Sequence, residues 1–155
     1  MRSNRTILVI VLGLTLGENT ASADVKSLCS KEEATVWSCQ IRKKIYSVCA
    51  SKNLAETTGY LQYRAGVLGK VDFIYPRGLE HPKDYFTFGM LARGTWLAFS
   101  NGSYRYWIAE EVTGKPVIEV SKDDRVLSAI ECDDSTYSLT LTSTMDMFRT
   151  IGVFK

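Results

Sequence analysis

The chain has 155 residues, the size of a single domain, and its 19 Lys and Arg against 17 Asp and Glu give a formal net charge of +2. This near-neutral balance argues against nucleic acid or an anionic membrane surface as a partner, because both are bound mainly through concentrated positive charge. The length suffices to bury a hydrophobic core.

The first 23 residues have the pattern of a signal peptide. Two arginines precede an apolar run over residues 7–14, and the sequence Ala-Ser-Ala ending at Ala23 supplies the small residues that signal peptidase accepts. The run is shorter than the ~20 apolar residues that span a bilayer. We therefore expect cleavage before Asp24, a periplasmic or secreted protein without a membrane anchor, and one domain over residues 24–155.

The remainder consists of short, aromatic-rich segments separated by Gly, Pro, Asn and Asp. Their regular spacing, without a long 3.6-residue periodicity, predicts an all-β fold: an antiparallel barrel-like sandwich of about eight or nine short strands, stapled by disulfides. The tail over residues 138–154 fits either one more strand or a short helix that closes an open end. The expected strands cover residues 35–41, 45–50, 60–64, 70–75, 85–91, 95–100, 103–111, 116–121 and 126–132.

Four cysteines, an even number in an exported chain, indicate two disulfides with three alternative pairings. If residues 42–44 form a hairpin turn, Cys39 and Cys49 lie opposite each other on neighbouring strands. That arrangement mildly favours a Cys39–Cys49 bond and leaves Cys29 to pair with Cys132. Metal binding is disfavoured because no Cys-x-x-Cys pair occurs, so we expect neither a metal nor a cofactor.

The dipeptide Asn101-Gly102, flanked by alternating segments, is the clearest local signal. A type I′ turn needs a positive φ at both central residues, and Asn-Gly provides it at the lowest cost. A two-residue turn at this point would place Tyr104 opposite a phenylalanine and Trp96 opposite Trp107. Both faces of this hairpin are rich in apolar side chains, so we expect it to be central and covered on both sides.

Residues suited to catalysis are few. His81 is the single histidine and precedes a proline in a turn-like stretch. The acidic pairs at residues 110–111 and 123–124 are adjacent in sequence, so on a strand their carboxylates would point to opposite faces. The second pair is better interpreted as a hairpin turn. With no nucleophile elbow or phosphate loop, we expect a protein that is not an enzyme.

Aromatic residues also alternate with arginine, as in Tyr104-Arg105-Tyr106. This pattern fits a surface that stacks on sugar rings. It fits better the aromatic filling of a small β core, and Arg105 could pack on Trp96 and Trp107 through cation–π contacts. We favour the packing interpretation.

The region from residue 85 to residue 132, which runs through Asn101-Gly102-Ser103-Tyr104 to a strand ending in cysteine, resembles bacterial periplasmic lysozyme inhibitors, particularly those directed at invertebrate-type lysozyme. In that family a Ser-Gly-x-Tyr loop of a small antiparallel β protein enters the lysozyme cleft. Here Asn101 replaces the loop serine. A second family pattern, Tyr-x-x-x-Thr-Lys-Gly, is not reproduced, and Thr113-Gly114-Lys115 is only a permuted counterpart.

This resemblance implies that Asn101, Gly102, Ser103 and Tyr104 bind a lysozyme, with Lys115 nearby as a second contact. A lysozyme cleft holds two carboxylates that flank the scissile bond, and hydrogen-bond donors on a rigid turn can meet them with little loss of entropy. The alternative is a non-catalytic ligand- or protein-binding β-barrel module of the cell envelope. A weaker alternative is a hydrolase whose catalytic residues are distant in sequence and come together only in the folded protein. The sequence also leaves open whether the protein forms a homo-oligomer.

Overall fold

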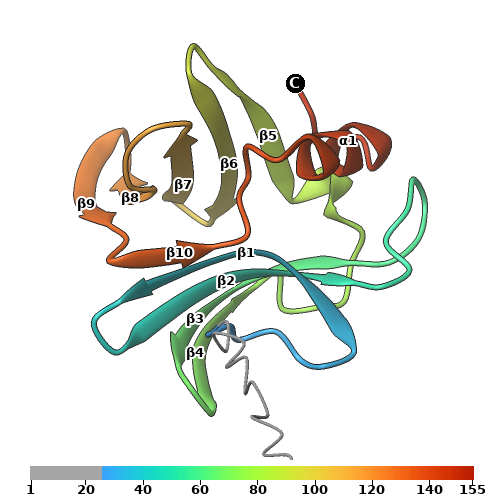
Figure 1. Cartoon of the computed structure of the whole chain (residues 1–155), viewed down its shortest axis with the longest axis horizontal. Coiled ribbons are helices and arrows are strands. Elements are labelled where there is room, and N and C mark those ends of the chain that lie inside the picture. The colour runs from blue at the N-terminus through green and yellow to red at the C-terminus, as the bar shows by residue number, and fades with distance from the viewer. Residues whose placement is uncertain (1–25) are drawn as a thin grey trace, which may run out of the picture.

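The computed structural model describes residues 26–155, so the expected signal peptide lies outside the described residues. The described chain forms two five-stranded antiparallel sheets that pack face to face (Figure 1). In strand order, the first sheet contains β10 (Asp134–Thr136), β1 (Glu33–Ile41), β2 (Lys44–Ser51), β3 (Leu61–Val67) and β4 (Lys70–Tyr75). The second contains β5 (Phe86–Leu91), β6 (Gly94–Asn101), β7 (Tyr104–Glu111), β8 (Val117–Lys122) and β9 (Arg125–Glu131).

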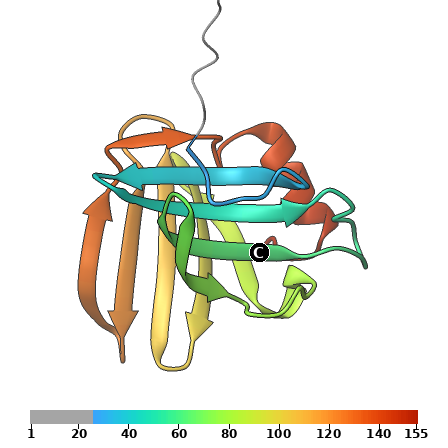
Figure 2. The same ribbon diagram turned by 90° about the horizontal axis from the view of Figure 1, so that it is seen from below.

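The strands of the first sheet run across those of the second (Figure 2), as in orthogonally packed sandwiches. No strand pairing joins the two sheets within residues 26–155, so the fold is a sandwich rather than a closed barrel. The predicted all-β, antiparallel, disulfide-stapled sandwich is confirmed. Residues 26–155 form ten strands, one more than the nine expected segments; the additional strand is β10, which pairs with β1 through Ser38 and Thr136.

The core lies between the sheets and follows from the two-residue alternation of the strands. Trp37, Val48 and Tyr63 are register partners across the first sheet, and all three point inward and are buried. Each strand thereby contributes every second side chain to the interior. Their counterparts on the second sheet are Leu97, Ile108 and Ile118, which are likewise buried.

Stacked rings fill the interior between β4 and β6. The ring of Phe99 lies 4.5 Å from that of Tyr75 and 4.6 Å from that of Tyr106, and both pairs are nearly parallel. Tyr63 packs against the same phenylalanine at 5.0 Å.

The tail forms a helix, one of its two predicted alternatives. Helix α1 (Thr142–Thr150) inserts Phe148 into the core, where its ring stacks on that of Phe88 at 4.3 Å. The last residues then run beside β5, since the amide of Phe88 donates to the carbonyl of Val153 and the amide of Lys155 donates to the carbonyl of Phe88.

The disulfides are Cys29–Cys49 and Cys39–Cys132, so all four cysteines are bonded but the favoured pairing is wrong. The β1–β2 turn has two residues rather than three, and Cys39 lies opposite Tyr46 instead of Cys49. Cys39 faces the core and Cys49 faces outward, toward residues 26–30. The Cys39–Cys132 bond therefore ties the first sheet to the end of the second, and the other bond fixes the N-terminal segment.

Candidate functional site

The predicted binding turn lies at one end of the second sheet. Asn101 pairs with Tyr104, so the two turn residues are Gly102 and Ser103, one position later than expected. Only Gly102 has a positive φ, of 60°, as a type II′ turn with glycine first requires. The expected type I′ turn centred on Asn101-Gly102 is therefore wrong, although the hairpin itself exists.

The one-residue displacement of the turn changes cross-strand partners but not faces. Trp96 now lies opposite Ala109, and Trp107 lies opposite Ala98. The two indole rings still stack diagonally across the hairpin, with centroids 4.4 Å apart and planes 15° from parallel. Both tryptophans belong to the outer face of the second sheet.

The tip of the hairpin, defined here as Asn101–Tyr104, is exposed at all four residues. The side chains of Asn101, Ser103 and Tyr104 form no hydrogen bond with the rest of residues 26–155. The tip offers amide and hydroxyl donors and contains no carboxylate. The ammonium group of Lys122 lies 5.3 Å from the centroid of the Tyr104 ring and adds a positive charge beside the tip.

Lys122 was not predicted as a site residue. It is the register partner of Tyr104 and immediately precedes the β8–β9 turn. That turn consists of Asp123 and Asp124, both with positive φ, which confirms their interpretation as a hairpin turn. The acidic turn was therefore a usable signal: the residue before it ends β8, and pairing β8 with β7 places that residue, Lys122, beside the tip. Both turns lie at the lower end of the sheet in Figure 2.

Lys115 does not join the tip. It lies in the loop between β7 and β8, whereas the tip lies at the other end of β7. The eight residues of β7 separate the two places, and at ~3.4 Å per residue this strand spans more than 20 Å. The expectation that Lys115 is a second contact near the tip is therefore corrected.

The other polar candidates are engaged in structural contacts. His81 Nε2 lies 2.9 Å from the carbonyl oxygen of Ala55. Buried Glu110 accepts hydrogen bonds from the Ser138 hydroxyl and the Leu139 amide. Among residues 26–155, no group of three or more histidine, cysteine or acidic side chains is arranged to hold a metal ion.

A buried ion pair lies on the outer face of the first sheet. The guanidinium of Arg64 donates to both carboxylate oxygens of Glu33, at 2.6 and 2.7 Å. Glu33 also accepts from the Ser30 amide and the Tyr60 hydroxyl. Burial opposes ionisation, but these hydrogen bonds and the charge of Arg64 outweigh it and hold the pKa of Glu33 below its ordinary value. Arg64 also donates to the Leu28 carbonyl, so the pair holds the N-terminal segment.

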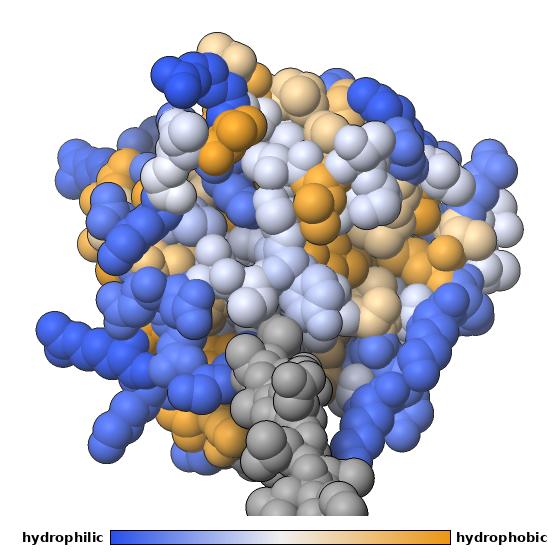
Figure 3. Space-filling view, viewed as in Figure 1, coloured by the Kyte–Doolittle hydropathy of each residue, from blue (hydrophilic) through white to orange (hydrophobic). Residues whose placement is uncertain are grey.

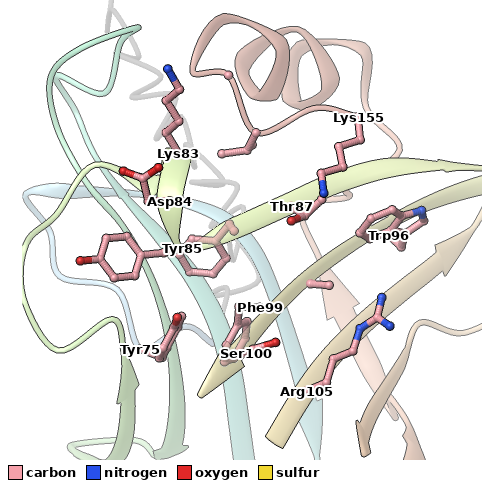
Figure 4. A pocket seen from close by; sticks show the side chains of 14 residues that line it. Tyr75, Lys83, Asp84, Tyr85, Thr87, Trp96, Phe99, Ser100, Arg105 and Lys155 are labelled. Carbon is pink, nitrogen blue, oxygen red and sulfur yellow. The ribbon is translucent and has the colours of Figure 1, made fainter. Parts of the chain in front are cut away.

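An open groove of about 430 Å³ lies on the outer face of the second sheet. Thr87 and Ala98, which are register partners, belong to its floor, and Trp96 stands beside them. Residues 83–85 and residues 152–155 approach from two sides (Figure 4). The sequence did not predict this groove, because its lining comes from five separate stretches of the chain.

The face shown in Figure 3 carries both apolar and hydrophilic areas, and many of its hydrophilic side chains lie around the rim. No helix within residues 26–155 has the length and apolar character needed to cross a membrane. Comparisons with protein-family models, with curated proteins and with solved structures found no significant match for this chain.

Proposed function

We propose that this protein is an exported, non-catalytic inhibitor that binds a lysozyme and inserts the tip Asn101–Tyr104 into the active-site cleft. The observation that carries the proposal is the composition of the exposed tip. It presents hydrogen-bond donors without a carboxylate, and Lys122 lies beside it. The two disulfides of the protein also support export, since such bonds persist in oxidising compartments.

The chemistry of a lysozyme cleft complements this tip. Two carboxyl groups flank the scissile glycosidic bond and accept hydrogen bonds from a ligand. Donors on the tip are the Asn101 amide, the Gly102 backbone N–H and the Ser103 hydroxyl. A hydrogen bond to a charged group contributes about 1.5–3 kcal/mol, so two or three such bonds supply much of the free energy of a tight complex.

The shape of the tip also supports the proposal. A two-residue turn is among the tightest connections between antiparallel strands, and neighbouring strands are only ~4.8 Å apart. The tip is therefore narrow enough for a cleft that accepts a polysaccharide chain. Because β7 pairs with β8 up to Tyr104 and Lys122, the tip is held in place before binding, which reduces the entropy lost in the complex.

The test is the lysis of bacterial cell walls, followed by turbidity, with chicken-type, goose-type and invertebrate-type lysozymes. The purified protein should slow lysis by at least one class at micromolar concentration. The variant Asn101→Ala/Tyr104→Ala should lose this inhibition while retaining its near-ultraviolet circular dichroism.

The matched control is Lys115→Ala, which removes an exposed positive charge from the opposite end of β7. It should inhibit as well as the unaltered protein. Absence of inhibition against all three classes would refute the proposal. Equal inhibition by the tip variant would place the binding surface elsewhere on the molecule.

A further inference from the structure

We propose that the groove on the outer face of the second sheet binds an acidic oligosaccharide, a function separate from lysozyme inhibition. The sugar ring would stack on Trp96, and its carboxylates would pair with Arg105 and Lys155. At about 430 Å³, the groove has the volume of one or two sugar units.

The aromatic wall is fixed by its neighbours. One indole face of Trp96 stacks on Trp107, and the edge of the ring lies directly over Gly89. A Cβ at Gly89 would approach within 2.6 Å of the indole, so only glycine permits this position. Trp96 remains half-buried rather than covered and lines the groove. A flat, immobile apolar surface of this kind suits the CH face of a pyranose ring.

Two cationic groups flank this aromatic wall. Figure 4 shows Trp96 between Arg105 and Lys155, with the ammonium group of Lys155 directed toward Thr87. Neither cation forms an ion pair with any group in residues 26–155. The Arg105 guanidinium lies 5.0 Å from the centroid of the Trp107 ring, a cation–π contact that leaves its donors free.

The strand pairing of the C-terminal segment sets the position of Lys155. The amide of this residue donates to the Phe88 carbonyl at 2.9 Å, and the Phe88 amide donates to the Val153 carbonyl at 2.8 Å. These bonds hold residues 153–155 beside β5, so that the Lys155 side chain reaches the groove. The site is therefore built by backbone pairing and does not depend on a free tail.

The distribution of charge favours an oligosaccharide over a single phosphate or a nucleotide. A phosphate site needs several donors that converge on one point, whereas Arg105 and Lys155 enter from different sides of the indole (Figure 4). An acidic oligosaccharide carries carboxylates on successive rings and can meet both cations. The hydroxyls of Thr87 and Ser100 and the carboxylate of Asp84 line the same groove and suit sugar hydroxyls.

The test is isothermal titration of the purified protein with trigalacturonic acid, its methyl ester and ATP. The acid should bind at least tenfold more tightly than the ester, the difference expected from one charge-assisted hydrogen bond. Its affinity should fall as salt is raised. No binding of the acid at millimolar concentration, equal binding of acid and ester, or preferential binding of ATP would overturn the proposal.

The variant Arg105→Gln, at an exposed residue, should retain the fold and weaken binding of the acid about tenfold or more. Lys43→Gln, which removes an exposed cation in the β1–β2 turn, is the matched control and should bind normally. The tip variant Asn101→Ala/Tyr104→Ala should also bind the acid normally, so that failure of the lysozyme proposal can be distinguished from failure of this one. Undiminished binding by Arg105→Gln would overturn the assignment.

Discussion

Replacing Glu33 by Gln tests the buried ion pair that holds the N-terminal segment. The side chains of Glu33 and Arg64 are 2% and 13% exposed, and two hydrogen bonds of 2.6 and 2.7 Å join them. Glutamine keeps the size of the side chain and one acceptor but removes the charge. Breaking a buried pair costs about 3–5 kcal/mol because it leaves the partner uncompensated. We expect Glu33→Gln to lose about 3 kcal/mol of the free energy of unfolding.

The assay is unfolding in guanidinium chloride, followed by tryptophan fluorescence, because Trp37 is fully buried in the core. Glu32→Gln is the matched control: the neighbouring side chain is exposed, and surface substitutions usually change stability by less than about 0.5 kcal/mol. Equal midpoints for the two variants would refute the structural role of the ion pair.

The pH dependence gives a second readout of the same pair. Because the pKa of Glu33 is lower in the folded than in the unfolded protein, its contribution is present above the ordinary value of 4.5 and is lost as pH falls through the folded-state pKa. The unaltered protein should therefore lose stability below about pH 4.5 more steeply than Glu33→Gln. Parallel pH profiles for the two proteins would contradict this account.

Other substitutions test the core, a disulfide and the turn. Phe99→Ala should cost about 3–5 kcal/mol in denaturant unfolding, because it removes the ring on which four others pack. The double variant Cys39→Ala/Cys132→Ala should lose up to about 4.7 kcal/mol, since its bond closes a loop with a sequence separation of 93; a loss below 1 kcal/mol would contradict the role of this bond. Gly102→Ala should cost about 1 kcal/mol, because alanine is strained at a φ of 60°. Burial raises the pKa of Tyr63 well above 10.0, so its ionisation, read by ultraviolet absorbance at alkaline pH, should appear only when the protein unfolds.

Most strands were predictable because alternation and turn residues agree along the chain. Strand β10 was missed because residues 133–136 are all polar and carry no alternating apolar pattern, and pairing with β1 makes them extended. The hairpin register was displaced because Asn101-Gly102 and Gly102-Ser103 both fit two-residue turns. The disulfide pairing depended on the length of the β1–β2 turn. A change of one residue in the register of a hairpin moves a cysteine to the other face of the sheet.

The candidate sites were predictable to different extents. The tip residues are consecutive, so a local motif could identify them. Lys122 required knowledge of strand pairing, and the separation of Lys115 from the tip required the direction of β7. The groove joins residues 83–85 to the C-terminal segment, which meet only because the latter pairs with β5. The one sequence signal near the groove was the alternation around Arg105, which points outward, whereas the neighbouring Tyr106 packs against the core.

Competition for the lysozyme cleft tests the central claim most directly. Binding of the purified protein to a lysozyme that it inhibits would be measured with and without a saturating chitin oligosaccharide that fills the active-site cleft. If the tip Asn101–Tyr104 enters the cleft, the oligosaccharide should abolish binding in a concentration-dependent manner. Unchanged affinity for the lysozyme with an occupied cleft would contradict the account.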